Sequence, residues 1–269
     1  MRERVGLTLS LRRYAHALLG RWPVAGARGR ARSRADQDAD DLAQAALLGF
    51  WRAGLLQGSG SPVQSSGALR LALLRCLTRL AREFSRYDEG AAAGAASRHF
   101  PWSPEARALP RLSFESRALL ALAALERLDY DDIGAVLDIS AAQALAGLAR
   151  ARAELSCETT GRRQQRLRIA SGVREADLHR YADDLLEPAR RAEIAALLDE
   201  DEEAARRVNE WRRGAERLRG AFATLEAEPL PATLDFSRRK PAPPAFRAKG
   251  SLKSVFAWLA GAPRSAAAR

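Results

Sequence analysis

Residues 128–152 constrain the fold of this chain more than any other segment. Apolar side chains first recur there at the spacing of a helix with one buried face, at Ile133, Val136 and Leu137. Ser140 and Gln143 then form an S-x-x-Q capping box, which predicts that a second helix begins at Ser140. Leu145 and Leu148 give this second helix its own apolar stripe. The segment therefore predicts a helix-turn-helix.

The second helix of such a motif can enter the major groove of DNA. Reading bases requires hydrogen-bonding side chains on its exposed N-terminal face, where this chain has mostly Ala and Gly. Gln143 is the one side chain there that could read a base edge, and its capping role competes for it. Arg150 and Arg152 follow later and are expected to contact phosphates or to be surface charge. The scaffold of a DNA reader is thus present with little base-reading chemistry.

The rest of the chain predicts an all-α fold. It is rich in Ala, Leu and Arg, and no segment alternates in hydropathy with the period of two that a strand requires. Its 269 residues suit about two domains of roughly 100–200 residues each. Further helices are expected over residues 6–22, 38–52, 66–87, 113–127, 173–185, 188–199, 202–225 and 251–261.

Composition shifts divide the chain into five parts. Gly, Ala and Pro dominate around residues 88–110, and Pro and basic residues dominate after residue 228. The expected parts are a helical domain at 1–88, a linker at 89–109, a helix-turn-helix domain at 110–156, a three-helix unit at 173–227 and a basic tail at 228–269.

The net charge of +11 is unevenly distributed. Residues 1–35 carry nine basic side chains and one acidic side chain, whereas residues 108–160 carry five basic and eight acidic ones. Proteins gain affinity for DNA by neutralising phosphates, so an acidic helix-turn-helix domain must depend on local arginines. Four arginines form a row on one face of the predicted 66–87 helix: Arg75, Arg79, Arg82 and Arg86. We expect these arginines to contact DNA, and a solvated helix face is the alternative.

Other functional classes find little support in the sequence. The two cysteines, Cys76 and Cys157, lie far apart and outside any metal-ligand spacing, which predicts reduced thiols. The three histidines fall in unrelated segments, and no phosphate-binding loop or hydrolase motif occurs. No signal peptide or apolar run of about 20 residues is present. We therefore expect a cytoplasmic protein that is not an enzyme and has no cofactor, metal or membrane span.

Residues 6–155 resemble the extracytoplasmic-function group of bacterial sigma factors. Residues 38–51 are similar to that group's D-A-E-D-L-x-Q-x-x-x-x-x-x-W segment, which docks on RNA polymerase core. The resemblance implies polymerase contacts at Asp40, Asp41, Gln44, Leu48 and Trp51, although Trp51 could equally be a core residue. It also implies that the 73–87 helix melts and reads the −10 element of the promoter, and that the segment from Leu109 to Leu155 reads the −35 element. Asp138 stands where the family's turn often has Gly, and Asp tolerates a left-handed backbone at modest cost.

Residues 176–208 resemble the cytoplasmic domain of anti-sigma factors. Zinc-type members carry H-x3-C-x2-C, whereas here His179 is followed by Asp183 and Leu186 at the cysteine positions. His179 is therefore expected to be a surface or packing residue without a metal. The resemblance implies a sigma-like module fused to a zinc-less anti-sigma-like module.

Two functions follow from these expectations. The first is a transcription initiation factor that binds RNA polymerase core and promoter DNA and is restrained by its own C-terminal unit, whose tether makes the restraint intramolecular. The second is a sigma mimic that no longer reads DNA and titrates a partner protein, such as a sigma or anti-sigma factor. The basic N-terminal domain favours the first function, and the Ala-rich recognition helix favours the second.

Overall fold

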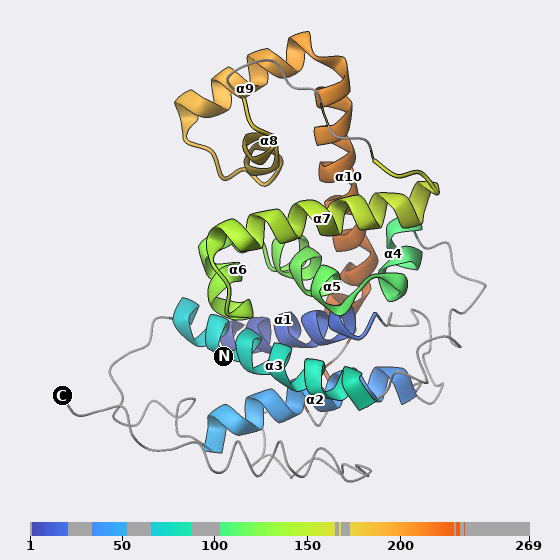
Figure 1. The fold of residues 1–269 in the computed structure, drawn as a ribbon. Helices are drawn as coiled ribbons and strands as arrows, with labels where there is room; N and C mark the ends of the chain where they lie inside the picture. Colours follow the sequence, from blue (N-terminus) through green and yellow to red (C-terminus); the bar gives the residue numbers. More distant parts are fainter. Residues whose placement is uncertain are drawn as a thin grey trace, which may run out of the picture.

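The structure is a computed structural model that describes residues 2–20, 34–52, 66–87, 103–164, 167, 173–228, 230, 231 and 234. Within these residues the chain is helical and has no strand, which confirms the all-α class for this part (Figure 1). The α-helices are α1 (Arg2–Leu18), α2 (Arg34–Arg52), α3 (Ser66–Tyr87), α4 (Pro104–Ala108), α5 (Phe114–Leu120), α6 (Tyr130–Leu137), α7 (Ala141–Thr160), α8 (Glu175–Ala182), α9 (Pro188–Glu200) and α10 (Glu202–Ala227). A 3-10 turn, η1 (Leu109–Arg111), and a π-helical turn, η2 (Ala121–Leu125), complete the series.

Helices α1, α2 and α3 pack against one another in the lower layer of Figure 1. Helix α1 also contacts α5, η2 and α10, and it therefore buries most of its residues beyond Ser10, including Arg12. The hydroxyl oxygens of Tyr14 on α1 and Thr78 on α3 lie 2.8 Å apart, so this contact is hydrogen-bonded as well as apolar.

Helices α6 and α7 form the predicted helix-turn-helix and meet at an angle of 93°. Helix α6 ends at Asp138, whose φ of 66° and ψ of 44° are left-handed, as the sequence suggested. The capping box is present, because the Ser140 hydroxyl accepts from Gln143 N at 3.2 Å and Gln143 Oε1 accepts from Ser140 N at 2.9 Å. The predicted start of the second helix is therefore confirmed.

The linker expected at residues 89–109 does not extend to residue 109. Ser103 caps α4 by accepting a hydrogen bond from Ala106 N at 3.2 Å, and Pro104 occupies the first helical position. Proline was interpreted as a break in this segment, whereas here it starts a helix.

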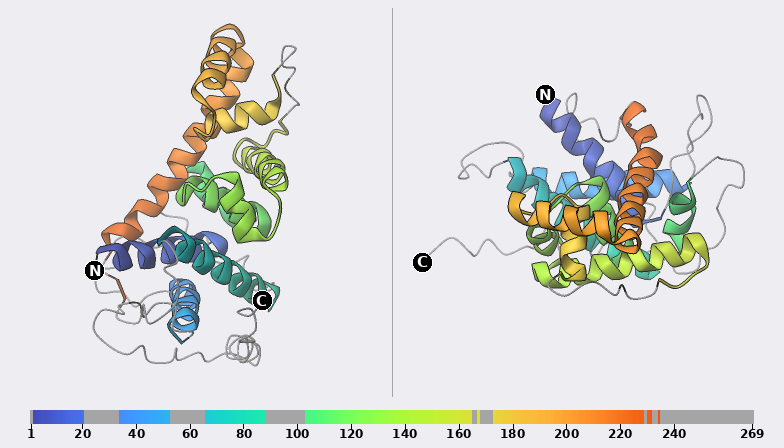
Figure 2. Two further views of the ribbon diagram at one scale, coloured as in Figure 1. Left: turned by 90° about the vertical axis from the view of Figure 1, so that its left-hand side faces the viewer. Right: turned by 90° about the horizontal axis from the view of Figure 1, so that it is seen from above.

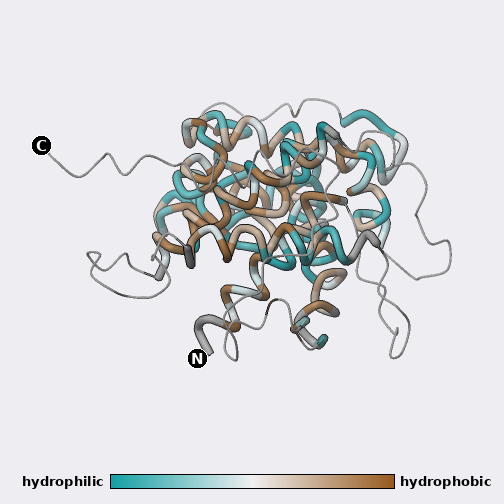
Figure 3. Tube along the Cα trace, turned by 90° about the horizontal axis from the view of Figure 1, so that it is seen from below, coloured by the Kyte–Doolittle hydropathy of each residue, from teal (hydrophilic) through white to brown (hydrophobic). Residues whose placement is uncertain are grey.

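One hydrophobic core joins the parts that the sequence separated into domains 1–88 and 110–156. It contains apolar side chains from α1–α3 and α5–α7, and also Leu218, Phe222 and Leu225 from the end of α10. Hydrophobic stretches gather in the middle of the molecule in Figure 3. The two regions therefore pack as one body in this structure.

Helices α8, α9 and the first half of α10 form a smaller unit with a second core. This core contains Leu178, Ile194, Val208 and Trp211. Helix α10 continues out of this unit and runs down to α1, as the left view of Figure 2 shows. A single helix thus belongs to both cores.

Part of what the sequence predicts for the C-terminal end cannot be placed in the structure. The helix expected over residues 251–261 and most of the basic tail lie outside the described residues. In the described part, no single helix has both the length and the apolar character of a membrane span, and α6 with α7 reaches that length only as a bent pair.

Candidate regulatory interface

The C-terminal unit contacts the helix-turn-helix through a buried polar cluster. Arg152 on α7 is 7% exposed and forms an ion pair with Asp183, which follows α8. The hydroxyl of Tyr130, the first residue of α6, donates to the other oxygen of Asp183 at 2.5 Å. Arg152 Nη1 also lies 2.9 Å from Nδ1 of His179. The cluster therefore joins α6 and α7 to α8.

Trp211 extends this cluster to α10. Its ring stacks on His179 with centroids 3.9 Å apart, and the Arg152 guanidinium lies over it at 5.6 Å. His179 is 2% exposed, so it is a packing histidine, which was one of the two roles expected. A cation above an indole ring and a stacked aromatic pair each contribute about 0.5–2 kcal/mol.

The cluster keeps His179 neutral. Burial, followed by the positive charges of Arg152 and Arg207, lowers the pKa of His179 to about 3. A neutral ring accepts at Nδ1 from Arg152 and carries its proton on Nε2. His179 Nε2 and Trp211 Nε1 are buried without a hydrogen-bond partner among the described residues. Each buried donor without a hydrogen bond costs about 1–3 kcal/mol of stability, so these two N–H groups weaken the interface.

A second buried cluster joins α1 and α3 to the end of η2. The Glu126 side chain is fully buried, and its two oxygens lie 2.8 Å from Arg13 Nη2 and 2.6 Å from Arg70 Nη2. Ser10 donates to the same carboxylate. The π-helical turn brings Glu126 inward, because Glu126 N bonds back to Ala121 O at 3.1 Å. No sequence motif predicts this cluster, because its members lie between 56 and 116 residues from Glu126 along the chain.

Arg12 connects α1 to both α2 and the end of α10. Its Nε lies 2.7 Å from Asp40 and its Nη2 lies 3.0 Å from Glu228, and its side chain is 1% exposed. The C-terminal unit therefore contacts the first helix through an ion pair as well as through apolar side chains. Sequence reasoning missed this role of Arg12, because one arginine among several on an N-terminal helix is usually a surface charge.

The residues expected to contact polymerase fall on different sides of α2. Asp40, Gln44 and Leu48 are each under 5% exposed and face the core. Asp41 is half-buried, and burial, followed by Asp38 and Asp40, raises its pKa to about 6. The side chain of Trp51 lies outside the described part. A polymerase contact through these residues stays a prediction. Of the four whose side chains are described, only Asp41 is accessible at the surface.

The arginine row on α3 faces acidic residues of the helix-turn-helix region. Arg75 Nη2 lies 2.8 Å and Arg79 Nη2 3.9 Å from Asp138, and Arg82 Nε lies 3.8 Å from Glu115. Arg86 pairs with Glu83 on its own helix at 2.8 Å. All four arginine side chains keep a third or more of their surface exposed. Exposed ion pairs of this kind are worth about 0–1 kcal/mol, so a phosphate could replace the carboxylates.

Helix α7, which the sequence predicts as a recognition helix, presents few groups that could bind DNA. Gln143 is exposed, but its side-chain oxygen is engaged by the capping box. Arg150 is exposed, and Arg152 is buried in the interface with α8. A DNA contact by Arg152 would require its ion pair with Asp183 to open.

The described residues contain no cluster of histidine, cysteine and acidic side chains that could hold a metal ion. Nδ1 of His179 faces Arg152, and Asp183 is in the ion pair. Cys76 and Cys157 are both half-buried and free, and burial raises the pKa of Cys76 to about 11. A thiol with such a pKa is poorly reactive at neutral pH.

Comparisons of this chain with protein-family models, with curated proteins and with solved structures gave no match. The geometry of the interface therefore carries the functional argument.

Proposed function

We propose that this protein is a sigma-factor-like regulator of transcription initiation that binds RNA polymerase core and promoter DNA in the cytoplasm. In this proposal, the anti-sigma-like C-terminal unit restrains the sigma-like helices. The observation that supports it is the course of α10, which packs on α8 and α9 at its start and on η2, α4 and α1 further along. A helix in two cores couples the position of the C-terminal unit to the helices that would bind polymerase and DNA.

The charges suit such a restraint. The Asp183 carboxylate of the C-terminal unit neutralises Arg152 on the recognition helix. The carboxylates that pair with the arginine row, Asp138 and Glu115, belong to the helix-turn-helix region itself and do not depend on the C-terminal unit. Each of these arginines is one that the sequence assigns to DNA. The carboxylates therefore occupy the sites that phosphates would take, and binding DNA would exchange one set of anions for the other.

A deletion of residues 161–269 is a poor test of this proposal. Leu218, Phe222 and Leu225 are buried in the main core, so a fragment of residues 1–160 would leave a hole there and fail for structural reasons. A point change in the full chain avoids this problem.

We therefore expect Asp183→Asn to weaken the restraint, because it leaves the buried Arg152 without a counter-charge. The variant should bind RNA polymerase core and promoter DNA at low salt more tightly than the unchanged protein. Asp199→Asn is the matched control, since Asp199 is exposed on α9 and no ion pair to it is seen among the described residues. A folded Asp183→Asn protein that binds neither target more tightly would contradict the proposal.

A second function is favoured by the exposed face of α7. Its exposed positions in the first three turns are Ala142, Gln143, Ala146 and Arg150. A helix with this surface suits protein contacts better than base edges. In this alternative, the protein is a sigma mimic that titrates a partner regulator. It predicts that Asp183→Asn binds a sigma or anti-sigma protein and leaves promoter DNA unbound even at low salt.

A further inference from the structure

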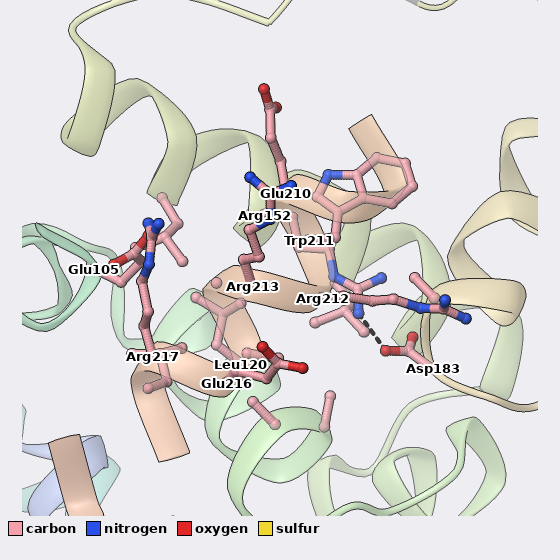
Figure 4. A pocket seen from close by; sticks show the side chains of 18 of the residues that line it. Glu105, Leu120, Arg152, Asp183, Glu210, Trp211, Arg212, Arg213, Glu216 and Arg217 are labelled. Atoms are coloured by element: carbon pink, nitrogen blue, oxygen red, sulfur yellow. Dashed lines mark hydrogen bonds and ion pairs between the residues drawn. The ribbon is translucent and has the colours of Figure 1, made fainter. Parts of the chain in front are cut away.

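A cleft of about 790 Å³ runs along α10 where this helix crosses the rest of the protein. Its walls come from α4, η2, α7 and the end of α8, and Figure 4 shows charged side chains of α10 projecting into it. Sites for small molecules typically have volumes of about 300–1,000 Å³ and mix apolar walls with a few polar groups. The apolar part of this cleft includes Leu120, Leu128 and Leu218.

Most carboxylates in the cleft are already paired with arginines. Glu105 lies 2.7 Å from Arg217, and Asp184 lies 2.9 Å from Arg191. Asp183 is engaged by Arg152, as described above. Glu216 also lines the cleft, and no ion pair to it is seen among the described residues, so it is the carboxylate that can still neutralise a cation there.

Three arginines of the cleft have no carboxylate partner among the described residues: Arg127, Arg213 and Arg219. Arg219 Nη1 donates to the carbonyl oxygen of Ala124 at 3.2 Å, and the carboxylate of Glu216, which also lines the cleft, offsets part of its charge. Burial, followed by the charge of Arg127, lowers the pKa of Arg219. The cleft thus brings like charges together from two separate elements.

The backbone at Arg127 is also unusual. Its φ of 53° is left-handed, a conformation that glycine adopts more readily than arginine. The position closes the end of η2, where Leu128 N donates to Leu122 O at 3.1 Å, and a left-handed residue is common at such a helix end. Here the arginine stands at the end of η2, on the wall opposite α10.

We propose that this cleft binds a phosphorylated small molecule, with Arg127 and Arg219 contacting the phosphate. Two guanidinium groups from different elements match the two negative charges of a phosphate better than the single charge of a carboxylate, and arginine binds phosphate oxygens in a bidentate manner. The apolar walls leave room for an organic part. This site is independent of the proposed function, because its ligand can be bound whether or not the protein contacts polymerase.

Isothermal titration calorimetry of the full chain with pyrophosphate and with ADP tests the site. We expect at least one of these probes to bind with a Kd below about 1 mM at low salt. Arg127→Gly should weaken this binding at least about tenfold, because it removes one charge-assisted contact. This substitution suits the left-handed backbone, so misfolding would not explain the loss. Arg219→Gln should act in the same direction.

Arg107→Ala is the matched control, since Arg107 is exposed on α4 and does not line the cleft. It should change the affinity by less than about twofold, as expected for a surface charge. The proposal is overturned if neither probe binds, or if Arg127→Gly and Arg219→Gln both bind as the unchanged protein does. It is also overturned if a short DNA duplex displaces the probes and depends on the same two arginines, because these would then be nucleic-acid contacts.

Discussion

Arg152 on α7 and Asp183 after α8 form an ion pair with side-chain exposures of only 7% and 16%. The arginine comes from the helix-turn-helix, and the carboxylate comes from the C-terminal unit. Because removing either partner leaves a charge in a desolvated place, this contact makes the position of the C-terminal unit sensitive to single substitutions.

A double-mutant cycle on this pair should show strong coupling. We expect Asp183→Leu alone and Arg152→Met alone each to lower the free energy of unfolding by about 3 kcal/mol, the usual scale for breaking a buried ion pair. Arg152→Met with Asp183→Leu should recover much of that loss, since an apolar pair has no charge to desolvate. Urea unfolding of the single and double variants measures the coupling, and additive effects would show that the pair contributes nothing of its own.

The interface should lose stability in mild acid. The pKa of His179 is about 3 in the folded protein, against an ordinary value of 6.5. The unfolded protein therefore binds a proton below pH 6.5 that the folded one excludes. The stabilisation is complete above pH 6.5 and decreases as the pH falls toward 3, by about 2 kcal/mol between pH 7 and 5.

His179→Gln separates this effect from the titration of other groups. Glutamine keeps an acceptor for Arg152 but does not titrate. Unfolding free energies measured from pH 7 to pH 5 should fall more steeply for the unchanged protein than for this variant. Equal slopes would mean that His179 is already protonated, or exposed, in the folded state.

Asp41→Asn should stabilise the protein at neutral pH. The pKa of Asp41 is raised from 3.8 to about 6, chiefly by burial. The protonated carboxyl of Asp41 contributes its full stabilisation below pH 3.8, and this contribution to the free energy of unfolding is lost as the pH rises through 6. At pH 7 the ionised carboxylate therefore destabilises the fold. Because the side chain is only half-buried, we expect a gain of about 1 kcal/mol after solvent screening.

The same substitution tests the resemblance of α2 to a polymerase-binding helix. A residue kept at a cost to stability is often kept for function. Asp41→Asn should therefore weaken any binding to RNA polymerase core while raising the urea midpoint. Asp199→Asn, with its exposed carboxylate on α9, controls for the loss of one negative charge.

Gly134→Ala should disrupt the turn of the helix-turn-helix. A Cβ atom at Gly134 would lie 2.6 Å from the backbone oxygen of Ile139, which cannot move without opening the turn. We expect a loss of about 2 kcal/mol or more in the free energy of unfolding, although alanine favours helix elsewhere.

Gly220→Ala is the matched control for this change. An added Cβ at Gly220 of α10 meets nothing within 4 Å, so the helix propensity of alanine should add about 0.5–1 kcal/mol. The two substitutions should thus shift the thermal midpoint in opposite directions. A neutral Gly134→Ala would show that the turn is looser than this structure indicates.

Local signals determined most of the helices and their ends. The capping box at Ser140, the left-handed Asp138 and the proline at the start of α9 act within four residues, so the sequence alone predicts them. The missed α4 had an equally local signal in Ser103 and Pro104, but three prolines nearby favoured a linker. The helical periodicity of residues 202–225 likewise predicted α10, but not what its far end touches.

Only the tertiary structure decided which charges are buried and what they pair with. Arg150 and Arg152 look alike in the sequence, yet one is exposed and the other lies beneath α8. Glu126 acquires its partners from α1 and α3, which are far away along the chain. Helix periodicity sets the face of a side chain, whereas burial depends on which other element packs on that face. In this protein, the packing of the two hydrophobic cores, both of which include residues of α10, determines which faces are covered.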